Sequence, residues 1–158
     1  MLQRIQTLYL VIVAIAGILL FFFPLANYYN EVQGNYKFFI YGIQSMDPEP
    51  KVLFNHFFTI PLIFLDVISL IFSASAIFLY KNRPLQIRIC AFNVLANIVM
   101  IMVIFFFYAT RIKTMTLTEP EYNFSGMMLP LISLAFLVLA TRAIRKDEAL
   151  VKSSDRLR

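Results

Sequence analysis

Four long stretches of this chain hold almost no charged residues, and they limit its possible folds more than any other feature. They fall at about residues 5–26, 55–80, 88–110 and 124–142. A helix needs about 20 apolar residues to cross a bilayer, and each stretch is close to that length or longer. The whole chain is 60% hydrophobic and 15% charged, so no polar helices are left to cover four apolar ones. We therefore predict an all-α transmembrane four-helix bundle, built as a single membrane domain over residues 1–158.

A signal peptide is the alternative interpretation of the first stretch, residues 5–26. Its apolar core exceeds the roughly 7–15 residues of a signal peptide, and no clear cleavage site follows it. We predict a retained anchor.

The basic residues predict the orientation, because cytoplasmic loops and ends of membrane proteins carry an excess of Lys and Arg. On the side of both termini these residues are Arg4, Lys81, Arg83, Arg88, Arg142, Arg145, Lys146, Lys152, Arg156 and Arg158. The opposite side has only Lys37, Lys51, Arg111 and Lys113. Both termini are therefore expected in the cytoplasm, and the net charge of +5 reflects orientation rather than a nucleic-acid site.

The outer side has one large loop, residues 27–54, which we predict to contain strands. Two runs of aromatic and β-branched residues flank a turn at Gly34, the pattern of a β-hairpin. In the second outer loop, apolar or Thr residues alternate from Ile112 to Thr118, which predicts a third strand over residues 111–118. Three strands would form a small antiparallel cap over the helices. Irregular loops on the lipid surface are the alternative.

The C-terminal residues 143–158 keep a helical charge pattern, so we predict that the fourth span continues as a hydrated cytoplasmic helix. The basic residues of this tail and its boundary are Arg142, Arg145, Lys146, Lys152, Arg156 and Arg158. They suit anionic lipid headgroups or a protein partner, whereas RNA binding lacks any aromatic platform. A solvated helix that only fixes the orientation is the simpler alternative.

Asp66 is the one acidic residue inside the four stretches. Counting back from Tyr80 places it about 21 Å from the inner end, near the middle of a ~30 Å hydrocarbon core. No Lys or Arg lies at matching depth, so we expect a neutral carboxyl group that forms hydrogen bonds. An acid at such a depth is a functional hypothesis by default.

Other polar residues are predicted to share an intramembrane face with this acid. The proposed face consists of Asp66, Ser69, Ser73, Asn93 and Asn97, at helical spacing on two consecutive spans. One interpretation is a proton or ion relay, or a small polar pocket. Another is hydrogen bonding between helices, worth ~0.6 kcal/mol per contact. A third is docking on a basic group of another subunit.

No pattern typical of catalysis or of cofactor or metal binding occurs in the chain. It has one Cys and one His, and it lacks the P-loop, GxGxxG, HExxH and GxSxG motifs. We therefore expect no enzymatic activity, no cofactor and no metal.

Three segments carry a resemblance to a known family. The opening QRIQTLYL, the inner turn NRPLQIRIC and the closing RAIRKDEALVKSSDRLR are similar to those of the bacterial domain-of-unknown-function family 4293. The resemblance covers essentially the whole chain. It implies a small four-span protein of the bacterial inner membrane, and it supplies no catalytic residues.

The function expected from these features is that of an accessory or scaffold subunit in a larger membrane complex. The chain has little soluble mass, and its charged tail suits docking to a membrane protein partner or to a second copy. The alternative is an oligomeric transporter or channel component that uses the face around Asp66.

Overall fold

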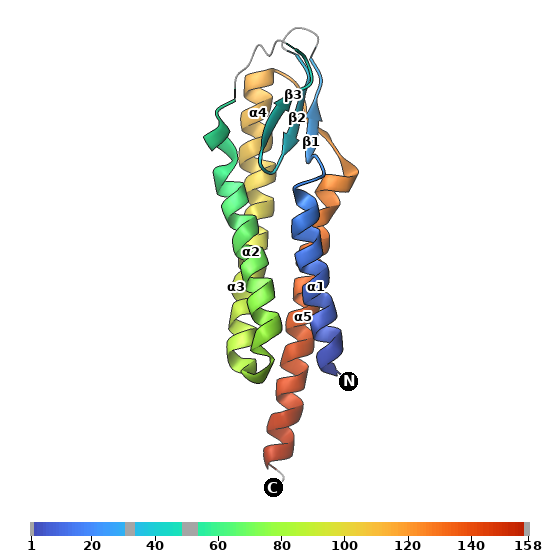
Figure 1. The fold of residues 1–158 in the computed structure, drawn as a ribbon, viewed down its shortest axis with the longest axis vertical. Coiled ribbons are helices and arrows are strands. Elements are labelled where there is room, and N and C mark those ends of the chain that lie inside the picture. Colours follow the sequence, from blue (N-terminus) through green and yellow to red (C-terminus); the bar gives the residue numbers. More distant parts are fainter. Residues whose placement is uncertain (1, 31–33, 49–53, 157–158) are drawn as a thin grey trace.

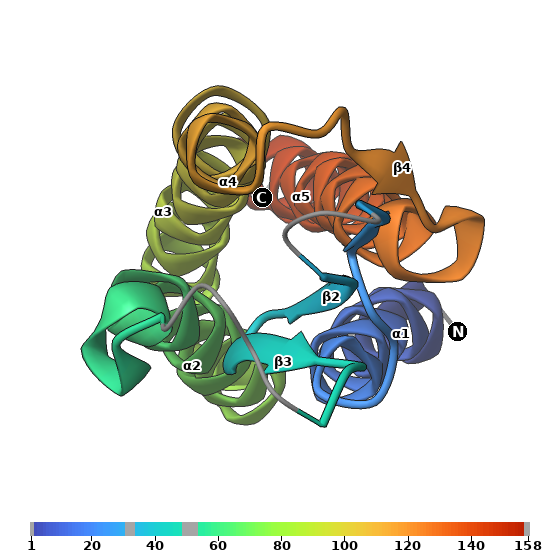
Figure 2. The same cartoon turned by 90° about the horizontal axis from the view of Figure 1, so that it is seen from above.

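The computed structural model describes residues 2–30, 34–48 and 54–156, in which a bundle of helices carries a small sheet at one end (Figure 1). The helices are α1 (Leu2–Leu20), α2 (Ile60–Phe78), α3 (Arg83–Met102), α4 (Ala109–Thr116) and α5 (Phe124–Arg156). Short 3₁₀ turns flank α2, η1 (His56–Thr59) before it and η2 (Leu79–Lys81) after it. Seen along its axis, the bundle is a ring in which α1 and α3 each pack against both α2 and α5 (Figure 2).

The first helix is shorter than the predicted stretch over residues 5–26, because it ends at Leu20. The backbone N–H groups of Phe22 and Phe23 still donate to Leu19, and the chain then turns away from the helix axis. Pro24 explains the end, since proline lacks an N–H group and disfavours helical geometry in the residue before it. The residues after it enter the sheet.

The third helix is longer than predicted and replaces the strand expected over residues 111–118. α3 runs through a π-helical segment, η3 (Val103–Tyr108), directly into α4. The strand prediction is wrong because Ile112 and Thr116, four residues apart, are both buried on one helical face. The helix ends where Leu117 adopts the left-handed conformation, with φ 54°.

The sheet has four short antiparallel strands in the order β3-β2-β1-β4. β1 (Ala26–Tyr28) pairs with β2 (Tyr36–Phe39), which confirms the predicted hairpin, and Gly34 between them has φ +96°. A second hairpin joins β2 to β3 (Gly42–Ser45) within what the sequence indicated as one run. The remaining strand is β4 (Glu121–Tyr122), just before α5, and it pairs with β1.

Aromatic residues join the sheet to the nearby ends of the helices. The Phe38 and Tyr108 rings stack with their centroids 5.6 Å apart, and the Tyr108 hydroxyl donates to the carbonyl oxygen of Phe58 at 2.7 Å. Tyr28 of β1 is fully buried, and its hydroxyl oxygen has no partner among the described residues. Its burial, followed by the nearby Tyr122, raises the pKa of the Tyr28 phenol well above its usual range. The sheet is thus packed on the bundle rather than spread over a surface.

The start of α5 meets the turn after α1 at very short range. A Cβ atom built on Gly126 would lie 2.1 Å from the carbonyl oxygen of Pro24 and 3.1 Å from the Cα atom of Leu25. The backbone N–H of Asn123 also donates to the carbonyl oxygen of Leu25 at 3.0 Å. Only glycine fits at position 126 without a backbone shift.

The bundle has an apolar exterior. Phe64, Phe78, Phe92 and Phe106 are between 60% and 81% exposed, far more than a monomeric soluble protein usually leaves uncovered. Among the described residues, three helical segments are long and apolar enough to cross a membrane: Phe57–Phe78, Arg83–Thr116 and Phe124–Val151. α1 adds a shorter apolar segment, Ile5–Leu20. These features are those of a membrane protein.

Candidate functional site: a buried polar seam

The faces that α2 and α3 turn towards the bundle interior are largely polar. Of the buried residues of α2, only Leu62 and Ala76 are apolar, and those of α3 include three side-chain amides. We use the term polar seam for Asp66, Ser69, Ser73, Asn93 and Asn97, each at most 5% exposed. All the residues predicted for the intramembrane face therefore lie in the interior together.

Within the polar seam, two asparagines of α3 form hydrogen bonds with the serines of α2. The Asn93 amide nitrogen donates to the Ser73 hydroxyl at 2.8 Å and to the Ser69 carbonyl oxygen at 3.1 Å. The Asn97 amide nitrogen donates to the Ser69 hydroxyl at 2.8 Å, and it lies 3.3 Å from the Asn93 side-chain oxygen. The contacts from these two residues to Ser69 and Ser73 are interhelical hydrogen bonds of the kind that stabilise helix pairs in membranes, whereas the contact between Asn97 and Asn93 lies within α3.

Two side-chain oxygens of the polar seam, on Asp66 and Asn97, are buried without a hydrogen-bond partner in the described part of the chain. The Asp66 Oδ2 atom is buried and has no hydrogen-bond partner within the described part of the chain. The Asn97 Oδ1 atom is in the same state. Because a buried polar atom without a partner is costly, each of these oxygens would be stabilised by a proton donor or a cation.

The first helix closes over Asp66 at a glycine. A Cβ atom built on Gly17 would lie 3.2 Å from Asp66 Oδ1 and 2.9 Å from Leu70 Cδ2. The α1 backbone therefore packs almost directly on the carboxyl group. Asp66 is nine residues after Phe57 and twelve before Phe78, about 14 and 18 Å along the helix. It thus lies in the middle third of its apolar segment.

A second polar cluster, which the sequence did not predict, lies at the opposite end of the bundle from the sheet. The Gln6 side-chain nitrogen donates to the Asp147 Oδ2 atom at 2.5 Å, and both residues are buried. Arg83 donates to the Asp147 carbonyl oxygen at 3.3 Å, and Gln86 donates to the Ala76 carbonyl oxygen at 2.8 Å. This inner cluster ties α5 to α1 and α3. The first turn of the tail is therefore packed, although a hydrated helix was expected.

The predicted tail residues are divided among several environments. Arg142, Arg145 and Lys146 are all exposed, and the two arginines also line a groove between α3 and α5. Arg158 and the side chains of Lys152 and Arg156 lie outside the described residues. The tail is helical as predicted, in that α5 is one helix from Phe124 to Arg156.

In the residues that the structure describes, no group of three His, Cys, Asp or Glu side chains is placed to hold a metal ion. The sole cysteine, Cys90, is buried and free. The polar seam holds hydrogen-bond donors and acceptors, and Asp66 adds a carboxyl group to them.

Comparisons with known proteins give one result. A family model described as a domain of unknown function (DUF4293) matches residues 2–157, which confirms the family resemblance of the sequence. No curated protein and no solved structure matches the chain.

Proposed function

We propose that this chain, which belongs to the DUF4293 family, is an accessory or scaffold subunit of a larger complex in the bacterial inner membrane. The observation that carries the proposal is the length of α5, which continues past the other helices at the end of the bundle away from the sheet (Figure 1). At that end α1 begins, and α2 and α3 are joined by a short turn, while the sheet lies at the opposite end. α5 thus supplies the main projecting surface.

The projecting part of α5 has the character of a docking element. The inner cluster holds the helix in place at Asp147, so the residues after it are presented by a fixed support. Leu150 and Val151 are 51% and 42% exposed on this part, beside charged neighbours. Exposed apolar residues on a charged helix fit the contact surface of a protein partner. The partner is a different membrane protein or a second copy of this chain.

The orientation is part of the same proposal. With both termini in the cytoplasm, the basic residues collect on the side where the positive-inside rule places them. The end of α5 then meets partners in the cytoplasm, and the sheet lies outside.

Site-specific photocrosslinking tests the role of α5. A photoreactive residue at Leu150 should crosslink in intact cells to one discrete protein, and a chain that ends at Glu148 should no longer copurify that protein. Leu139 is the matched control because it is 42% exposed on the same helix but lies between the apolar residues Val138 and Ala140, about 16 Å before Leu150. Equal crosslinking from both positions, or copurification unchanged by the truncation, would contradict the proposal.

A second candidate function rests on Asp66. A buried carboxyl group with one oxygen unpartnered is suited to bind and release a proton, so the polar seam fits a component of an oligomeric transporter or channel. In proteoliposomes, Asp66→Asn should abolish a pH-dependent flux because the amide cannot titrate. Asn93→Ala is the control, since it removes hydrogen bonds but leaves the carboxyl group. A flux that survives Asp66→Asn would exclude this function.

A further inference from the structure

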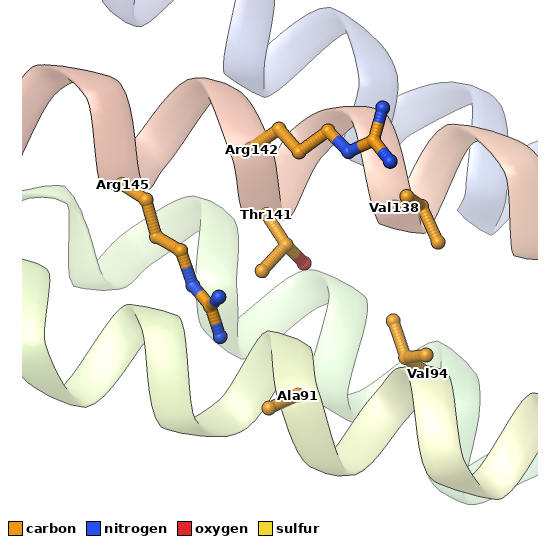
Figure 3. Close-up of a pocket in the computed structure, with 6 residues that line it drawn as sticks. All are labelled: Ala91, Val94, Val138, Thr141, Arg142 and Arg145. Atoms are coloured by element: carbon orange, nitrogen blue, oxygen red, sulfur yellow. The ribbon is translucent and has the colours of Figure 1, made fainter.

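A groove with two arginines at its rim runs between α3 and α5 (Figure 3). Its volume is about 240 Å³, and its apolar lining comes from Ala91 and Val94 of α3 and Val138 of α5. The Arg145 side chain extends from α5 towards Ala91, and the Arg142 side chain extends along α5 towards Val138. The groove therefore combines an apolar floor with two guanidinium groups.

The depth of the groove matches a membrane surface. At a rise of 1.5 Å per residue, Arg142 lies about 27 Å and Arg145 about 32 Å along α5 from Phe124. A hydrocarbon core is about 30 Å thick. If α5 crosses the hydrocarbon core from Phe124 onwards, Arg142 and Arg145 lie on either side of the second membrane surface, while Val138 and the neighbouring Val94 lie on the hydrocarbon side.

The two arginines of the groove have no carboxylate partner among the described residues. The ion pair found in that part of the chain joins Lys113 to Glu119, at the other end of the bundle. The Thr141 hydroxyl donates to the Leu137 carbonyl oxygen at 2.8 Å, so its proton is already used. Two guanidinium groups are thus left for an anionic ligand.

We infer that this groove is a binding site for an anionic phospholipid. Figure 3 shows the Arg142 and Arg145 guanidinium groups pointing in different directions, and both exposed side chains turn towards the phosphate when the lipid binds. Guanidinium presents several N–H donors in a geometry that fits phosphate. The floor of Ala91, Val94 and Val138 receives the upper part of an acyl chain. Basic pockets between membrane helices bind acidic lipids by this combination of charge and apolar surface. This inference does not depend on the docking role of the α5 end.

The test measures which lipids stay on the protein. The full chain is reconstituted in vesicles of phosphatidylcholine with an equal part of phosphatidylglycerol, extracted in mild detergent, and examined by native mass spectrometry. Retained phosphatidylglycerol should exceed phosphatidylcholine. Each basic side chain near an anionic surface contributes about fivefold. The double variant Arg142→Gln/Arg145→Gln should therefore reduce the preference by about 25-fold.

Three further variants separate a defined site from general surface attraction. Lys146→Gln removes one charge beside the groove and should reduce the preference far less than Arg145→Gln. Ala91→Phe keeps both arginines and fills the floor, so it should lower phosphatidylglycerol retention. Arg142→Lys/Arg145→Lys keeps the charge and should retain part of the preference. Glycerol phosphate, a headgroup without acyl chains, should not displace the lipid.

Several results would overturn the inference. These are a preference unchanged in the double glutamine variant, equal losses for Lys146→Gln and Arg145→Gln, retention unaffected by Ala91→Phe, or displacement by glycerol phosphate. Size-exclusion profiles and circular dichroism identify a variant that has unfolded. In that case Ala91→Phe and the double lysine variant decide the question, because each leaves the charge of the groove intact.

Discussion

The contact between Gly126 and the turn after α1 makes Gly126→Ala a sharp test of the packing. The new methyl group would meet the Pro24 carbonyl oxygen at 2.1 Å, well short of the 3.4 Å at which ordinary contact begins. Because the obstructing atom is backbone, relief requires the whole turn to move. Overpacking of this kind costs about 1–3 kcal/mol, and a clash this short belongs at the upper end of that range.

One effect opposes this strain. Alanine is better than glycine in a helix interior by about 1 kcal/mol. The net expectation for Gly126→Ala is therefore a loss of about 2 kcal/mol in the free energy of unfolding. The chain has no Trp, so unfolding by SDS titration in mixed micelles is best followed by far-ultraviolet circular dichroism.

Two other glycines serve as controls in the same assay. A Cβ atom on Gly42 would meet nothing within 4 Å, so Gly42→Ala should be close to neutral. A Cβ atom on Gly17 would meet Leu70 Cδ2 at 2.9 Å, and this flexible side chain can shift, so the loss for Gly17→Ala should be below about 1 kcal/mol. If Gly126→Ala is as stable as Gly42→Ala, the close approach of α5 to the turn is refuted.

Two further predictions concern buried polar groups. Gln6→Ala should lower the free energy of unfolding by about 2 kcal/mol, because it leaves the buried Asp147 carboxylate without its donor. In a double-mutant cycle measured by SDS titration, the loss should be smaller when Asp147→Ala is already present. Tyr28→Phe should be no less stable than the parent at neutral pH, since it removes a hydroxyl without a partner. The raised pKa of Tyr28 means that the folded state favours the neutral phenol more than the unfolded state does. The free energy of unfolding therefore has its full value below the ordinary pKa of 10.0 and falls as the pH rises beyond it. Unfolding measured from pH 9 to pH 11 should therefore show a weaker pH dependence in Tyr28→Phe than in the parent, and equal slopes would contradict this explanation.

The polar seam could be predicted from sequence because polar residues are conspicuous inside apolar stretches. Helical periodicity alone placed Ser69 and Ser73 with Asp66, and the structure brings all of these residues to the interior. The inner cluster gave no such signal, because Gln6 lies at the start of α1 and Asp147 lies in the charged part of α5, where polar residues are normally solvated. Their pairing joins residues 141 positions apart, which no local pattern reports.

The errors in the fold have a similar origin. From Ile112 to Thr118 the β-branched residues alternate as in a strand, but burial of Ile112 and Thr116 on one helical face decides in favour of α4. The hairpin at Gly34 was predictable because glycine readily adopts the positive φ angle that its turn requires. The strand β4 was not, since two residues paired to β1 depend on where α5 begins.

The π-helical segment η3 determines how the chain tolerates changes in its length. In α3, before this segment, buried residues are spaced three and four apart, as at Asn93, Asn97 and Met100. From Ile104 through Tyr108 to Ile112 the spacing is four each time. Six residues at the roughly 82° per residue of a π-helix turn the chain about as far as five residues of ordinary α-helix at about 100°. Loss of a single residue within Val103–Tyr108 would therefore restore an α-helix and leave Ile112 facing the sheet. The same deletion in the α-helical part of α3 would turn every later residue by about 100° and separate the sheet end of the helix from its contacts.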